Sequence, residues 1–278
     1  MLRGITSAGL GKIESDAQLI ELAGRYGFQA VDLDVLTLTE RYGIEGARQL
    51  LETNGVVIGS FGLPVEWRST EEKFLEDFQK LASYAAAAQT FGCTRCCTFI
   101  LPSTDHDSAH FMALAIRRLR QCAQLLNVYG IRLGLEFVGP HHLRTRWRNP
   151  FIWTMEETLD FIRAIDEQNV GLLLDSYHWY TTGLTRSHIE SLRAEQIVHV
   201  HINDAPNVAI EEVLDNGRIY PGEGIIDLVG FLQSLQTIGY TGPVSQEVLT
   251  GQALAETPQQ LIARSKKGFD LVFAGAGL

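Results

Sequence analysis

Short apolar runs rich in β-branched residues alternate along the chain with segments whose apolar positions recur at a helical period. Several runs are almost continuously apolar, which is typical of parallel strands covered on both faces. The pattern predicts strands at residues 3–8, 29–35, 56–63, 95–100, 131–139, 170–176, 197–204 and 243–249.

The segments between these runs carry the signals of amphipathic helices. Ser69 and Glu72 form a capping-box pattern, and the apolar face that follows it ends at Gly92. Further helices are expected over residues 108–130 and 154–167, and in a last segment that Thr257-Pro258 opens as N-cap and first-turn residue.

Eight strands alternating with about eight helices predict an α/β fold, and eight parallel strands are the number that closes as a (β/α)8 TIM barrel. An open doubly wound sheet is the alternative, but no G-x-G-x-x-G follows the first strand. Nothing between the apolar segments has the composition of a linker, so we expect residues 1–278 to form a single domain.

Composition narrows the class of protein. Its four cysteines lie in apolar surroundings, and we interpret them as buried free thiols in a reducing compartment, because no second pair completes a zinc site with Cys93-x-x-Cys96. We find neither a secretion signal nor an apolar run that could span a membrane, so a cytoplasmic location is expected. The formal net charge of −10 argues against an extended nucleic-acid surface.

Chemistry is expected where strands end, because active sites of such barrels lie at the carboxyl ends of the strands. The last four strands each end in an acid or a histidine: Glu136, Asp175, His201 and Glu247. Singly, each has a structural explanation as a capped acid or a hydrogen-bonded core histidine. Together, three converging carboxylates would repel one another unless a cation intervened, and such a set suits Mn²⁺, Mg²⁺, Co²⁺ or Zn²⁺.

The motifs around these residues resemble the sugar isomerase/epimerase superfamily with the xylose-isomerase-like barrel. The spacing is most similar to 2-keto-myo-inositol isomerases, then to D-tagatose 3-epimerases and hydroxypyruvate isomerases. The motifs are "GLEFVG", "LLLDSYHWY", "HVHINDAP", "YPGEGIIDL" and "SQEVL". The resemblance implies one divalent ion bound by Glu136, Asp175, His201 and Glu247. It also implies that Glu136 and Glu247 move a proton on a small sugar or keto-polyol through an enediolate.

The same resemblance assigns substrate contacts. His178, in the D-x-x-H pattern, matches a substrate-binding histidine. Arg218 matches a loop arginine that contacts substrate or closes the mouth, with a solvated loop arginine as the alternative. Trp67 offers an apolar wall for a sugar ring, with rim packing or a subunit contact of a homo-oligomer as the alternative. His199 is expected one layer deeper than His201, as a packed or supporting residue.

Two loops beside the predicted mouth raise the question of an anionic substrate. Residues 139–151 concentrate three arginines and two histidines, which fits either a keto-acid or sugar phosphate, or ion pairs with the protein's own acids or a partner subunit. "PGEG" is a poor phosphate cradle, because Glu223 would oppose the anion.

Some other functions of the same fold require residues that differ from those present here. An endonuclease IV-type nuclease needs histidines after the third and fourth strands and an Asp-Arg-His triplet, whose place here holds Gly217, Arg218 and Ile219. We therefore expect no nucleic-acid partner. A dehydratase acting on a keto-inositol remains an alternative, since the same metal and bases can eliminate water. A binding module without turnover is disfavoured because both glutamates are present.

Overall fold

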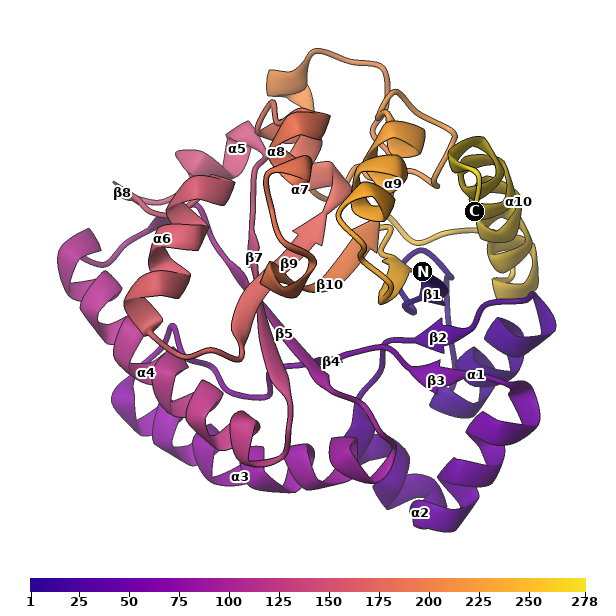
Figure 1. Ribbon diagram of the computed structural model, residues 1–278, viewed down its shortest axis with the longest axis horizontal. Helices are drawn as coiled ribbons and strands as arrows, with labels where there is room; N and C mark the ends of the chain where they lie inside the picture. Colours follow the sequence, from indigo (N-terminus) through magenta and orange to yellow (C-terminus); the bar gives the residue numbers. More distant parts are fainter.

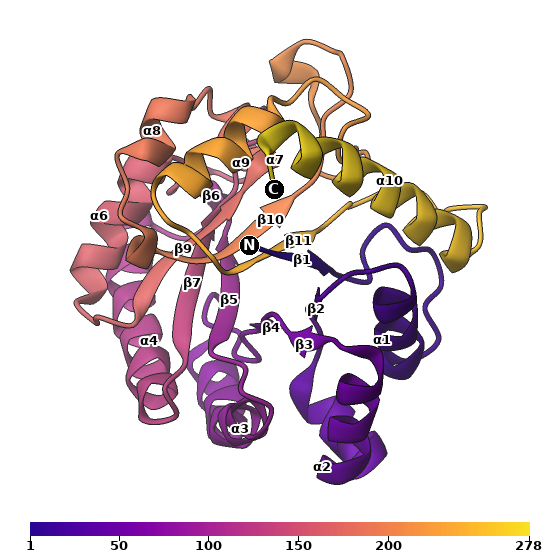
Figure 2. The ribbon, with the colours of Figure 1, turned by 45° about the vertical axis from the view of Figure 1, so that its right-hand side comes forward.

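A parallel sheet of nine strands occupies the middle of the molecule and helices surround it (Figure 1). The computed structural model describes residues 1–278. The strand order is β3-β2-β1-β11-β10-β9-β7-β5-β4, and β1, β11, β10 and β9 lie side by side (Figure 2). The bounds are β1 (Leu2–Ile5), β2 (Ala30–Val31), β3 (Val57–Ile58), β4 (Phe61–Gly62), β5 (Arg95–Ile100), β7 (Arg132–Phe137), β9 (Val170–Asp175), β10 (Ile197–Ile202) and β11 (Pro243–Gln246).

The two ends of this order belong to one chain segment. β3 pairs with β2 and β4 pairs with β5, and only Gly59 and Ser60 separate β3 from β4. The strand predicted at residues 56–63 is thus interrupted at its centre, which makes nine strands of the expected eight. Because this segment contacts both neighbours, the sheet is a nearly closed barrel, and the predicted TIM-barrel fold is confirmed.

Ten α-helices and two short 3-10 helices, η1 (Ala194–Gln196) and η2 (Ile210–Glu212), accompany the strands. Their bounds are α1 (Asp16–Arg25), α2 (Val35–Asn54), α3 (Glu71–Thr90), α4 (Ser108–Val128), α5 (His141–Arg144), α6 (Met155–Ile165), α7 (Ser176–Thr181), α8 (Arg186–Glu190), α9 (Leu228–Thr237) and α10 (Pro258–Ala276). A small antiparallel sheet of β6 (Ser103–Thr104) and β8 (Asn149–Pro150), which the sequence did not predict, joins the loops after β5 and β7. None of the helices combines the length and the apolar character that a membrane span requires.

Helix starts follow local capping chemistry, with one correction. The expected cap Ser69 is wrong by one residue: Thr70 caps α3, and its hydroxyl accepts a hydrogen bond from the Lys73 N–H. The Ser69 carbonyl instead accepts a hydrogen bond from Arg118. Thr257 caps α10 as predicted, in a reciprocal capping box with Gln260.

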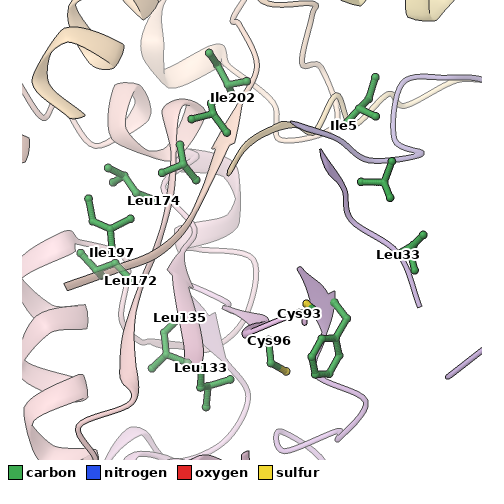
Figure 3. Close-up of a cluster of buried hydrophobic side chains, with 14 of the residues drawn as sticks. Ile5, Leu33, Cys93, Cys96, Leu133, Leu135, Leu172, Leu174, Ile197 and Ile202 are labelled. Carbon is green, nitrogen blue, oxygen red and sulfur yellow. The ribbon is translucent and has the colours of Figure 1, made fainter. Parts of the chain in front are cut away.

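The core lies between the strands and the surrounding helices. Apolar side chains from segments far apart in the sequence form one buried cluster, part of which Figure 3 shows, among them Ile5, Leu33, Leu135 and Ile202. All four cysteines are free and buried, as expected. Burial raises the pKa of the Cys93 thiol to about 12, so this thiol stays protonated and unreactive at neutral pH.

Candidate metal centre and active site

Four donor side chains converge where the last strands of the barrel end. Glu136 lies near the end of β7, Asp175 ends β9, His201 lies near the end of β10, and Glu247 directly follows β11. One ligand atom from each lies within 4.8 Å of those of the others. The residues predicted as metal ligands from their positions at strand ends are therefore brought together, although they span more than a hundred positions in the chain.

His201 stands at the centre of this cluster. Its Nδ1 lies 3.4 Å from Glu247 Oε2, 3.7 Å from Glu136 Oε1 and 3.9 Å from Asp175 Oδ2. Burial by itself would lower the pKa of His201, but the Glu247 charge and neighbouring carboxylate contacts hold that pKa well above its usual value. The cluster thus favours positive charge at this point, and an imidazolium supplies it when no cation is bound.

The donor set fits a divalent cation. Glu136 Oε1 and His201 Nδ1 are buried and have no hydrogen-bond partner in the protein. Buried polar atoms are normally paired, so these two are free to bind a ligand at the cluster. Burial also raises the pKa of Glu136, because the loss of water around its carboxylate outweighs the stabilising effect of His201 and His178. Three carboxylates and one imidazole are ligands that hard and borderline divalent ions accept.

Arg218 is a buried member of the cluster and not a solvated loop residue. Its Nη1 donates to Asp175 Oδ2 and to Glu247 Oε2, each at 2.8 Å, and its Nη2 donates to Asp215 Oδ1 at 2.8 Å. Burial opposes its charge, yet Asp175 and Asp215 raise the pKa of Arg218 well above its usual value. This guanidinium neutralises and orients two of the donor carboxylates.

His178 lies beside Glu136 at the start of α7. Its Nδ1 accepts a hydrogen bond from the Gly139 N–H at 3.2 Å, and its Nε2 lies 3.3 Å from Arg218 Nη2. Nε2 lies 3.9 Å from Glu136 Oε1. The side chain is therefore aimed at the cluster, while its substrate contact stays a prediction.

Trp67 takes a different place from the predicted open wall. It is fully buried, its indole N–H donates to Thr98 Oγ1, and its ring stacks on Phe111. It lines a cavity of about 220 Å³ next to the donor cluster, not the cavity that contains Glu136. Its large apolar ring is used for packing, so a direct sugar contact would need movement of its neighbours.

The donor cluster opens into a cavity of about 330 Å³. Glu136, His201 and Glu247 line one part of it, while Phe99 and Arg68 line another. Phe99 is 42% exposed, which is unusual for an aromatic side chain within a barrel strand. The cavity therefore offers acids and a histidine on one side and an apolar ring with a cation on the other.

Three contributors to the site were missed by the sequence reasoning. Phe99 and Arg68 carry no pattern that separates them from packing residues. Asn203 is the third: its Nδ2 donates to both carboxylate oxygens of Asp175 at 3.1 Å and fixes that side chain. Its place in "HVHIND", directly after β10, was the one signal available.

The basic loop 139–151 is largely used inside the protein. Arg144 donates to the carbonyls of Gly139 and Thr181 and lies 3.7 Å over the ring of Trp153. Arg148 donates to the Asp105 carbonyl at 2.5 Å. These contacts are with backbone and aromatic groups, and they hold the loop in place. They favour neither an anionic substrate nor ion pairs with acids of this protein or of a partner subunit.

Asp204 organises the "PGEG" loop. Its carboxylate accepts hydrogen bonds from the N–H groups of Ala205, Gly222, Gly224 and Ile226, at 2.9 to 3.0 Å. The loop amides that a phosphate would need are thus already engaged by a protein acid, which agrees with the expectation that the loop is no phosphate cradle.

Fold and cluster together define a TIM-barrel protein with an acid–histidine centre at the carboxyl ends of its strands, where active sites of such barrels lie. The chain belongs to the xylose isomerase-like TIM barrel family, whose model matches residues 20–267. The family-level resemblance inferred from the motifs is confirmed.

Individual relatives refine this placement. The chain is 32% identical to an inosose isomerase of Bacillus subtilis over 152 residues, which are 54% of this chain and 51% of that protein. It is 36% identical to a 3-dehydroshikimate dehydratase of Pseudomonas aeruginosa over 138 residues, 49% of this chain and 20% of that protein. The alignments thus span about half the length of the first relative and a fifth of the second.

Two solved structures cover the whole chain. A xylose isomerase domain protein from Alicyclobacillus acidocaldarius matches with a TM-score of 0.93 and 34% identity, over 100% of both chains. The IolI protein "with a binding zinc atom" matches with a TM-score of 0.81 and 20% identity, also over 100% of both chains. The second likeness is one of fold.

Proposed function

We propose that residues 1–278 act as one domain, a divalent-metal-dependent isomerase or epimerase of a small polyhydroxy ketone, with keto-inositols as the first substrates to test. The observation that carries the proposal is the convergence of Glu136, Asp175, His201 and Glu247 beside a cavity of about 330 Å³, with unpaired donor atoms on Glu136 and His201. The similarity to an inosose isomerase supports the substrate class.

Glu136, Asp175, His201 and Glu247 would hold the ion, and the zinc atom named for the related IolI structure supports a metal of this kind. When bound, the ion polarises the carbonyl of the substrate and makes the neighbouring carbon-bound hydrogen more acidic. That assistance is needed because a carboxylate, with an ordinary pKa near 4.5, is a weak base toward carbon.

The two glutamates are placed to move the proton. They come from strands separated by β9 and β10 in the sheet order, and they approach His201 Nδ1 from different sides. Despite its burial, His201 and Arg218 hold the pKa of Glu247 well below its usual value, so Glu247 is ionised and able to accept a proton. Glu136 can return a proton from the other side of the substrate.

A dehydratase of the same fold is the second candidate. The 36% identity to a 3-dehydroshikimate dehydratase favours it. The first step would be shared, since a glutamate removes the proton next to the carbonyl. The hydroxyl one carbon further would then leave as water after receiving a proton, and a carbon–carbon double bond would form. The two candidates therefore differ in product and not in the initial proton transfer.

Proton exchange with solvent deuterium tests both candidates. The Mn²⁺-loaded protein would be incubated in D₂O with keto-inositols, ketohexoses, hydroxypyruvate and 3-dehydroshikimate, and followed by NMR. Deuterium incorporation with an isomeric product supports the isomerase, and a new alkene signal supports the dehydratase. Incision of abasic-site DNA without exchange on any substrate would contradict both.

Matched variants assign the chemistry. Glu247→Gln should keep the fold and lower exchange by roughly 10²–10⁴-fold, because an amide cannot relay a proton. Glu223→Gln, which alters a glutamate paired with Arg264 outside the cavity, should leave exchange unchanged. Exchange by Glu247→Gln at the parental rate would remove Glu247 from the mechanism.

A further inference from the structure

A buried carboxylate, Asp32, lies directly behind His201. It follows β2, and its Oδ2 is 3.5 Å from His201 Nε2 and 2.8 Å from His199 Nε2. The Asp32 side chain is 9% exposed and the His199 side chain is fully buried. One carboxylate oxygen therefore faces the Nε2 atoms of both histidines of "HVHIND".

This arrangement decides how the His201 ring is presented. A carboxylate oxygen is an acceptor, so the Nε2 that faces it is the nitrogen that carries a proton. The opposite nitrogen, Nδ1, faces Glu247, Glu136 and Asp175 at 3.4 to 3.9 Å. The ring thus turns to the donor cluster the nitrogen that can lose its proton to bind a cation, and its Nε2–H to a carboxylate, the arrangement that orients many metal-binding histidines.

His199 holds Asp32 in position. Its hydrogen bond to Oδ2 is the shorter of the two contacts, and its ring stands edge-on to that of His201 at an angle of 84°. Both histidines project from β10, which keeps their spacing fixed. Because it hydrogen-bonds the oxygen that His201 also faces, His199 restricts the direction from which Asp32 can approach.

The backbone around Asp32 is shaped for this carboxylate. Gly59 lies at the break between β3 and β4, and a Cβ at that position would lie 2.5 Å from Asp32 Oδ1. A side chain there would displace the carboxylate from His199 and His201. The absence of a side chain at Gly59 therefore makes room for Asp32.

We propose that Asp32 and His199 form a positioning pair that fixes His201 with its Nδ1 lone pair toward the cavity, and that metal affinity depends on this pair. The inference rests on the proposed metal function of Glu136, Asp175, His201 and Glu247. Neither member of the pair is itself a ligand in it; each acts through His201.

Metal titration is the first test. Dissociation constants for Mn²⁺ and Zn²⁺ would be measured calorimetrically on the full chain. Asp32→Asn should bind roughly 10–100-fold more weakly, because the variant lacks the charge that orients the ring. Gly59→Ala should weaken binding in the same direction. Asp34→Asn is the matched control: Asp34 caps α2 through the Thr37 N–H, and asparagine caps equally well, so affinity should not change.

The histidine tautomer is the second readout. In a long-range ¹H–¹⁵N spectrum of the zinc-loaded parent, His201 should show a metal-bound Nδ1 and a protonated Nε2, and Asp32→Asn should alter that pattern. A metal-bound Nε2, or parental affinity in Asp32→Asn with an unchanged spectrum, would overturn the positioning pair alone. A parent protein that binds neither ion would overturn the proposed metal function, so the two failures are distinguishable.

Discussion

Replacing the buried Arg218 with methionine tests whether its guanidinium and a bound metal neutralise the same carboxylates. In the parent, its guanidinium lies 2.8 Å from Asp175 Oδ2, Glu247 Oε2 and Asp215 Oδ1. Methionine fills similar space but leaves these three carboxylates without their shared cation. A bound divalent ion would restore positive charge to Asp175 and Glu247, so the metal-free protein should be affected most.

The expected magnitude follows from the burial of the group. Removing one partner of a buried ion pair costs about 3–5 kcal/mol in the free energy of unfolding. For a chain of this size each kcal/mol corresponds to roughly 2–4 °C in Tm, so metal-free Arg218→Met should melt roughly 6–20 °C below the parent. Each tenfold gain in the metal affinity of Arg218→Met over that of the parent adds about 1.4 kcal/mol to its free energy of unfolding at saturating metal. This gain raises its Tm by roughly 3–6 °C.

Calorimetry with chelator and with saturating Mn²⁺ measures both effects. Arg118→Met is the control, since Arg118 is equally buried and donates to Glu71 and to the Trp67 carbonyl, outside the donor cluster. It should lose less stability than Arg218→Met, because its carboxylate partner Glu71 is exposed, while its metal-induced rise in Tm equals that of the parent. Arg218→Met should show a larger rise. An equal or smaller rise would refute the view that Arg218 and a metal neutralise the same carboxylates.

Three further outcomes are expected. Native protein should react with fewer than one equivalent of a thiol reagent at pH 8, and with four in denaturant, because burial raises the pKa of Cys93 and of Cys122 to about 12. Asp204→Asn should lower the unfolding free energy by roughly 1–3 kcal/mol or more in chemical denaturation, since loop N–H groups lose an acceptor; an unchanged midpoint would contradict this. Metal-free protein should lose stability as the pH falls below about 4.5. The pKa of Glu247 is lower in the folded than in the unfolded protein, so its charge stabilises the fold above its ordinary pKa of 4.5, and this stabilisation is lost as Glu247 becomes protonated. Melting curves at pH 4 and pH 6 would show the loss.

The barrel and the location of the donor cluster were predictable from local patterns. Continuous apolar runs alternating with helical segments indicate parallel strands, and parallel strands in a barrel all end at one mouth. A residue at a strand end is therefore assigned to the mouth without knowledge of its neighbours. For this reason Glu136, Asp175, His201 and Glu247 could be grouped from the sequence, and the structure brings their donor atoms together.

Only the tertiary structure shows which side chains from distant parts of the sequence are buried against one another. The sequence allowed Arg218 to be a loop arginine at the mouth or a solvated one. The structure instead encloses it between Asp175 and Glu247, which come from other strands. Trp67 could be an apolar wall for a sugar ring, a packing residue or a subunit contact from the sequence, and the structure packs it against Phe111 and Thr98.

The contact between Asp32 and His199 shows the physical reason most clearly. These residues are 167 positions apart, and β1 and β11 separate β2 from β10 in the sheet, so the two side chains meet only because the sheet curves into a barrel. Secondary structure follows from periodicities a few residues long, so the sequence determined the elements and the end of the barrel at which the donors lie. Hydrogen bonds between side chains depend on the register and closure of the whole sheet, and these exist only in the folded chain.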